Sequence, residues 1–263
     1  MNIQRISSFS DNGIGGNPAG VVIVDQLPSA AQMQDIAAQV GYSETAFAMK
    51  HGNGFKVRYF APTMEVPFCG HATIALGAAL GAEFGAGTYP LYLSQTDITV
   101  DAMPDGDEWG AQLTSPATSQ RPMDDTDLDA VLALFGWAHD DLSSIPPTFA
   151  NGGADHVLLF LNDRETLAQM QYDFDEGLAL MQRMGLVTIN CLYREADDLF
   201  HSRNAFASGG VVEDPATGAA AAALAGYLRD QDIHTAPFTV LQGVDMGAPS
   251  RLHVTPLPPK GAG

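Results

Sequence analysis

The chain has 263 residues and 46% of them are hydrophobic, which is enough for one large domain or two of moderate size. Its 31 acidic and 12 basic residues give a formal net charge of −19, which argues against nucleic acid or an anionic membrane as a partner. The two cysteines, Cys69 and Cys191, are too few for a disulfide framework, and the N-terminal residues lack an apolar signal segment. We therefore expect a cytoplasmic protein that neither binds nucleic acid nor spans a membrane.

The first half of the chain predicts short strands around two helices. Strands are expected, in chain order, at residues 3–9, 21–24, 46–49, 55–60, 89–93, 98–102 and 109–113. Apolar spacing at Met33, Ile36 and Val40 predicts a helix with Ser29 as its N-cap. A second helix is expected from about His71 to Leu80, after a turn at residues 67–70.

The second half follows a linker-like segment at residues 115–125 and repeats this order. Helices are expected at 128–135, at 167–184 and from Asp214, and strands at 157–161, 186–192, 199–206, 238–241 and 251–254. Strands outnumber helices, so the predicted fold class is α+β. The predicted halves are residues 1–115 and 125–249, with residues 250–263 able to return to the first half.

An internal repeat supports two related halves. An offset of 144 residues carries Ala72-Thr73 onto Ala216-Thr217, and residues 78–80 onto residues 222–224. The shared Ala-Thr and Ala-Ala-Leu at one register indicate two copies of a structural unit, each with a helix that starts at a polar turn. A site shared between two such helix starts is the expected place for chemistry.

Glu44 is the first candidate for chemistry, because it lies where an apolar strand begins. The residue 144 positions later is Thr188, so only one copy of the repeat carries a carboxylate here. This asymmetry is what a single-base proton transfer needs. On the local sequence alone, a surface glutamate at a strand end is the simpler interpretation.

The two helix starts are the second candidate. Cys69-Gly70-His71 precedes one helix, where free N–H groups can hold a carboxylate and His71 can donate a proton. Asp214 is expected to be the N-cap of the other helix, with Pro215 at its first position. Taken alone, each of these residues is more simply explained by a capping or packing role. The remaining histidines are scattered without ligand spacing, so no metal site is predicted.

Taken in order, the motifs resemble the phenazine-biosynthesis PhzF family, within the diaminopimelate epimerase-like fold. The resemblance covers nearly the whole chain and is carried by residues 16–21, 43–47 and 58–62, Glu65, and residues 69–73, 213–218, 242–243 and 246–250. It implies two pseudo-symmetric halves, each a curved sheet or barrel around a central helix, with the active site in the cleft between them. It also suggests a homodimer.

The resemblance implies a cofactor-independent isomerase of the trans-2,3-dihydro-3-hydroxyanthranilate isomerase type, acting on a small carboxylated substrate. Glu44 matches the residue that moves the proton, and His71 and Asp214 match two assisting catalytic residues. The implied substrate-binding residues are Asn17, Cys69, Gly70, Thr217, Gly218 and Ala219.

Two departures from related sequences keep alternatives open. Ala219 stands where the family often has serine, which leaves the substrate open. The racemases and epimerases of this fold use a pair of cysteines, one before each central helix. Here Cys69 occupies the first of these positions, but Glu213 and Asp214 occupy the second. One alternative is therefore an epimerase with Cys69 opposite Asp214 or Glu213, and another is a binding protein for small anions without catalysis.

Overall fold

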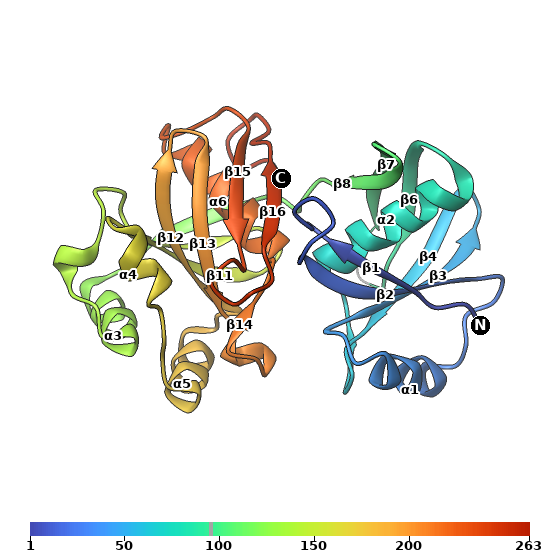
Figure 1. Ribbon diagram of the computed structural model, residues 1–263, viewed down its shortest axis with the longest axis horizontal. Helices are drawn as coiled ribbons and strands as arrows, with labels where there is room; N and C mark the ends of the chain where they lie inside the picture. The colour runs from blue at the N-terminus through green and yellow to red at the C-terminus, as the bar shows by residue number, and fades with distance from the viewer. Residues whose placement is uncertain (95–96) are drawn as a thin grey trace. The chain divides into compact units, whose positions relative to one another are not determined.

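The computed structural model of the protein describes residues 1–94 and 97–263, which form two compact units. The first unit comprises residues 1–8 and 17–114, and the second comprises residues 9–16 and 115–263 (Figure 1). The expectation that residues 250–263 return to the first half is wrong, because the last strand pairs with its neighbour in the second sheet. Residues 9–16 also belong to the second unit, where the backbone N–H of Gly16 donates to Pro249 O.

The first unit is a mixed eight-stranded sheet with two helices. The strands follow the order β1-β2-β3-β4-β6-β7-β8, with β5 paired to β4. The elements are β1 (Gln4–Ser8), β2 (Asn17–Val24), α1 (Ala30–Val40), β3 (Thr45–His51), β4 (Gly54–Phe60), β5 (Glu65–Val66), α2 (Gly70–Phe84), β6 (Gly87–Tyr92), β7 (Asp97–Asp105) and β8 (Glu108–Leu113).

The two helices of this unit differ in burial because their sequences differ. The expected cap of α1 is confirmed: Ser29 and Gln32 form a capping box, and Gly41 ends the helix with a φ of 73°. Helix α2 is apolar almost all round, and ten of its residues are buried. Its alanines and leucines pack against β-strand side chains such as Tyr59 and Val100, so α2 is the central helix of this sheet.

The second unit repeats the topology. Its strands follow the order β16-β15-β13-β12-β11-β10-β9, with β14 paired to β13. The elements are β9 (Ser119–Pro122), α3 (Asp125–Phe135), η1 (His139–Asp141), β10 (Thr148–Asn151), β11 (Asp155–Leu161), α4 (Arg164–Ala168), α5 (Phe174–Met184), β12 (Thr188–Ala196), β13 (Leu199–Ala205), η2 (Ala207–Gly209), β14 (Glu213–Asp214), α6 (Gly218–Asp230), β15 (Phe238–Gln242) and β16 (Ser250–Val254).

Helix α6 is the central helix of the second sheet, as α2 is of the first. Its buried alanines and leucines pack with Leu158, Leu192 and Phe200 from the strands. Gly152, in the turn after β10, lies so close to α6 that a Cβ there would come within 2.5 Å of Ala223 N. The predicted α+β class, with one sheet around one central helix in each half, is thus confirmed.

The register of the repeat differs from the predicted one at these helices. Helix α2 starts at Gly70 and α6 starts at Gly218. The distance between these two starts exceeds the predicted offset of 144 residues by about one helical turn. Most of the extra length lies between β13 and β14, where the short helix η2 is inserted. As a result, Ala72 and Thr73 lie inside α2, whereas Ala216 and Thr217 precede α6.

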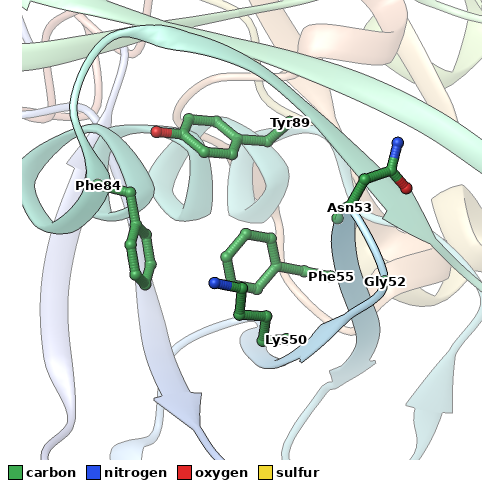
Figure 2. A pocket seen from close by; sticks show the side chains of 7 residues that line it. Lys50, Gly52, Asn53, Phe55, Phe84 and Tyr89 are labelled. Atoms are coloured by element: carbon green, nitrogen blue, oxygen red, sulfur yellow. The ribbon is translucent and has the colours of Figure 1, made fainter.

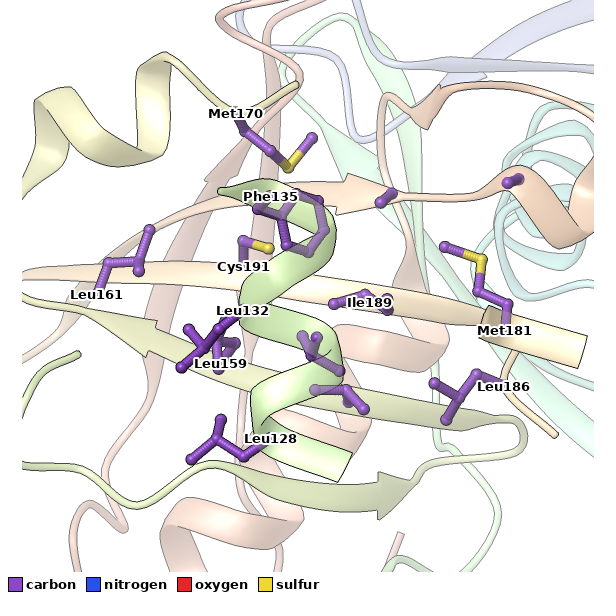
Figure 3. Packing of buried hydrophobic residues seen from close by; sticks show 14 of the residues in the cluster. Leu128, Leu132, Phe135, Leu159, Leu161, Met170, Met181, Leu186, Ile189 and Cys191 are labelled. Atoms are coloured by element: carbon purple, nitrogen blue, oxygen red, sulfur yellow. The ribbon is translucent and has the colours of Figure 1, made fainter. Parts of the chain in front are cut away.

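The other face of the second sheet carries helices α3, α4 and α5. Leu128, Leu132 and Phe135 of α3 pack against Leu159 and Cys191 of the strands (Figure 3). Burial raises the pKa of the Cys191 thiol, so this cysteine is a packing residue. The predicted single helix over 167–184 is wrong, because Asp173 caps a new helix at Glu176 N and α4 has already ended.

None of the helices within residues 1–94 and 97–263 is long and apolar enough to cross a membrane.

A fully buried histidine of the second sheet makes stability depend on pH. Burial lowers the pKa of His156 from 6.5 to about 4, so its imidazole stays neutral in the fold while the unfolded chain binds a proton. Stability should therefore fall as the pH drops below 6.5, by about 3 kcal/mol in total at pH 4. Urea unfolding of wild type and of His156→Leu between pH 7 and pH 4 measures this, and equal slopes for the two proteins would contradict it.

Candidate active site

Two predicted site residues of the first unit, Glu44 and Cys69, lie beside the imidazole ring of a third, His71. His71 Nε2 is 3.5 Å from Glu44 Oε2, and His71 Nδ1 is 3.3 Å from Cys69 Sγ. The hydroxyl of Ser43 also approaches Nε2, at 3.3 Å. The His71 side chain is 9% exposed and that of Glu44 is 19% exposed, so the carboxylate is the more accessible member of the pair.

The start of α2 fixes this arrangement. Cys69 is the N-cap, and its carbonyl accepts from both the backbone N–H and the hydroxyl of Thr73. The buried Tyr59 hydroxyl lies 2.6 Å from Thr73 Oγ1, and the Ser8 hydroxyl donates to His71 O. The backbone of Glu44, just before β3 begins, is anchored to β2, because the Glu44 carbonyl accepts a hydrogen bond from Gly20 N–H. The loop, the helix start and two strands thus place the three side chains together.

Burial decides the charge of the imidazole. It lowers the pKa of His71 below the usual range, and the nearby Glu44 carboxylate opposes this shift. We therefore treat His71 as neutral at pH 7. An ionised carboxylate has no proton to give, so the ring proton belongs on Nε2 and the Cys69 thiol can donate to Nδ1. The ring then connects the carboxylate to the thiol.

Glu44, Cys69 and His71 also come close enough to be considered as metal ligands. One ligand atom of each lies within 4.8 Å of the others, a convergence that histidine spacing along the chain did not predict. The carboxylate faces Nε2, however, and the thiol faces Nδ1. One ion binds one ring nitrogen, so this geometry suits a hydrogen-bonded chain better than a chelate.

The predicted site residues of the second unit form a separate polar group before α6. Asp214 Oδ2 accepts from the Thr217 hydroxyl at 2.5 Å, and the Gln242 side chain connects to both residues. Gln242 Nε2 donates to Asp214 O and Thr217 Oγ1, while its Oε1 accepts from Thr217 N–H. Gln242 is 1% exposed, so these bonds hold the turn rigidly.

Asp214 does not have the capping role that the sequence predicted. It lies in β14, paired with Asn204, and the N-cap of α6 is Thr217. Thr217 makes no side-chain cap bond, because its hydroxyl is used by Asp214. Asp214, which is 9% exposed, thus has its carboxylate bonded to the Thr217 hydroxyl just before the helix.

The ion pair of Glu213 with Arg203 excludes Glu213 as a candidate general base. Both of its carboxylate oxygens accept from the Arg203 guanidinium, at 3.1 and 2.6 Å. The same guanidinium donates to Ala168 O and Met170 O. Glu213 therefore has a structural role, and only Asp214 remains as the second base in the epimerase alternative.

The predicted substrate-binding residues divide between the two units. Asn17 is buried at the start of β2, and a Cβ built on Gly70 would meet nothing within 4 Å. A Cβ on Gly218 would be 3.4 Å from the Phe9 ring, and Ala219 is partly exposed in the first turn of α6. Sequence reasoning missed Ser43 and gave no role to Gln242. Both lie within the quoted motifs, so motif membership was their only signal.

An open cavity elsewhere in the first unit does not coincide with these residues. It has a volume of about 310 Å³ and is lined by Lys50, residues 52–55, Phe84 and Tyr89. Figure 2 shows the Lys50 amino group among the aromatic rings, 6.0 Å from the Phe84 centroid. Its lining offers one cation, Lys50, and no carboxylate or histidine that could pair with it in acid–base chemistry.

Comparison with known proteins extends the resemblance. The family model for phenazine biosynthesis-like protein, PhzC-PhzF, matches residues 6–257. The trans-2,3-dihydro-3-hydroxyanthranilate isomerase of Pseudomonas fluorescens is 32% identical over 258 residues, which cover 95% of this chain and 88% of that protein.

Solved structures confirm the fold. The PhzF-family phenazine biosynthesis protein of Bacillus anthracis has a TM-score of 0.83 at 21% identity, over 95% of this chain and 88% of its own. A probable proline racemase of Agrobacterium radiobacter K84 has a TM-score of 0.64 at 12% identity, over 97% and 84%. The predicted diaminopimelate epimerase-like fold is therefore correct.

Proposed function

The chain belongs to the PhzF family and is an isomerase, and we propose that it moves a proton on a small carboxylated substrate without a cofactor. Glu44 is the general base, which takes a proton from one carbon and returns it to another. The observation that supports this most strongly is the contact of the partly exposed Glu44 carboxylate with the buried, neutral His71 ring.

The surroundings of Glu44 support an acid–base role. A neutral imidazole that donates from Nε2 stabilises the carboxylate and still lets it accept a proton, whereas an arginine would hold it ionised. The carbon that loses the proton must lie next to a conjugated system, because one carboxylate cannot deprotonate an unactivated C–H bond. The substrate carboxylate is held by free backbone N–H groups at the start of α2, beside Glu44 and His71, because the net charge of −19 repels anions elsewhere.

Asp214 is the third member of the proposed catalytic set. Its hydrogen bond from Thr217 and the bonds of Gln242 fix the carboxylate in one orientation. We assign it to substrate orientation and proton movement, through the family resemblance. A homodimer in solution is part of the same proposal.

Proton exchange in deuterium oxide tests the proposed function. The purified protein is incubated with trans-2,3-dihydro-3-hydroxyanthranilate, and one-dimensional proton NMR follows the substrate C–H signals. Loss of a single C–H signal, with formation of an isomer, is the expected result. If no signal is lost with this compound or with a panel of small carboxylates that raise the melting temperature, the protein is a binding protein and the proposal fails.

Replacement of Cys69 by serine separates the isomerase from the epimerase alternative. Serine keeps a hydroxyl that can donate to His71 Nδ1, so the isomerase should lose less than about tenfold in rate. An epimerase that uses the thiol as a base would lose nearly all activity, because a serine hydroxyl is a far weaker acid. Rates of deuterium incorporation for wild type and Cys69→Ser measure the difference.

A further inference from the structure

A group of polar side chains lies inside the second sheet, on the face that packs against α6. It consists of His156 of β11, Thr188 and Asn190 of β12, and Ser202 and Asn204 of β13. All five are at most 3% exposed. Apolar residues occupy the same face further along these strands, where they form the core around α6. Polar groups in such surroundings need hydrogen-bond partners to offset the loss of water.

Four of these side chains have partners, and Asn204 has none in the part of the chain that the structure describes. His156 Nδ1 lies 2.7 Å from Thr188 Oγ1, and the Ser202 hydroxyl donates to Asn190 Oδ1 at 2.5 Å. Neither Oδ1 nor Nδ2 of Asn204 meets a partner within the described ranges 1–94 and 97–263, although the residue is 0% exposed. An amide with both groups unsatisfied is a cost to the fold, which calls for an explanation.

The position of Asn204 gives that explanation. Asn204 lies directly opposite Asp214 in the β13–β14 pair and opposite Asn190 in the β12–β13 pair. Directly opposed residues of antiparallel strands point to the same face, with Cβ atoms about 5 Å apart. The Asn204 and Asp214 side chains are therefore neighbours on one face of the sheet, and the Asp214 carboxylate is itself bonded to Thr217 just before α6.

We propose that Asn204 binds the substrate and orients it beside Asp214. This inference rests on the proposed function. The amide offers one acceptor and one two-proton donor, and a carboxylate alone would satisfy only the donor. The substrate therefore presents a hydrogen-bond donor next to an acceptor, as a small carboxylic acid with a neighbouring amino or hydroxyl group does.

The proposal predicts that Asn204 weakens the ligand-free protein. Asn204→Leu keeps the branched shape without the polar atoms, so its melting temperature should rise by about 2–4 °C. Asn204→Val, which is smaller, serves as a second variant if leucine does not fit. An unchanged or lower melting temperature in both variants would mean that an internal water satisfies the amide, and would overturn the proposal.

Ligand selectivity is the decisive readout. Calorimetry compares 3-hydroxyanthranilate, which has amino and hydroxyl groups, with benzoate, which has only the carboxylate. Wild type should bind 3-hydroxyanthranilate about tenfold more tightly, and the Asn204 variants should bind both compounds equally. His156→Leu is the matched control, because it removes another buried polar group from the same face and should keep the preference.

The outcomes distinguish this inference from the proposed function. If wild type exchanges the substrate proton but its preference survives in the Asn204 variants, only the role of Asn204 fails. If the preference depends on Asn204 but no proton is exchanged, only the isomerase mechanism fails. If wild type shows no preference between the two compounds, the role of Asn204 is overturned.

Discussion

Glu44→Gln should lower the rate of substrate proton exchange at least about a thousandfold. Glutamine has nearly the same shape and keeps a carbonyl oxygen toward His71 Nε2, so the structural contact remains while the base is lost. Binding of the substrate carboxylate should change little, because backbone N–H groups hold it. Single-turnover exchange in deuterium oxide measures the rate, and calorimetry with 3-hydroxyanthranilate measures the affinity.

Glu83→Gln is the matched control for this experiment. Glu83 lies near the exposed end of α2 in the same unit, so the variant makes the same change of charge without touching the candidate site. The control should keep the wild-type rate. A Glu44→Gln protein that retains more than about a tenth of the rate would show that another group is the base.

Sequence reasoning predicted the fold where apolar patterns were unambiguous. Most strands of both sheets and the central helices were expected, because alternation and small-residue runs are local signals. Strands β9 and β10 were missed, and β9 lies in the segment 115–125 that was predicted to be a linker. The split of the predicted helix 167–184 into α4 and α5 was missed, since Asp173 reads as an ordinary helix-surface residue until its bond to Glu176 N is seen. Likewise, Asp214-Pro215 predicted a helix start, whereas the pairing of Asp214 with Asn204 makes it a strand residue.

The site was only partly predictable for a related reason. Glu44, His71 and Cys69 are separated by up to 27 residues, and their contact follows from the packing of α2 against the strands. Motif order identified these residues, but only the folded structure shows that the carboxylate and the thiol face different ring nitrogens. Asn204 and Arg203 gave no local signal at all, since their roles depend on a cross-strand partner.

Arg203→Met should destabilise the second unit by about 3–5 kcal/mol. Arg203 and Glu213 form a buried ion pair with side chains 12% and 5% exposed, so loss of the guanidinium leaves a carboxylate buried without compensation. The carbonyls of Ala168 and Met170 lose their donors as well. Urea unfolding at pH 7 measures the effect.

Two comparisons identify the buried charge as the cause. Arg164→Met removes a more exposed pair, with side chains 29% and 21% exposed, and should cost under about 1 kcal/mol. Adding Glu213→Gln should recover part of the loss at pH 7. If Glu213→Gln recovers none of the lost stability, the loss comes instead from the missing hydrogen bonds at Ala168 O and Met170 O.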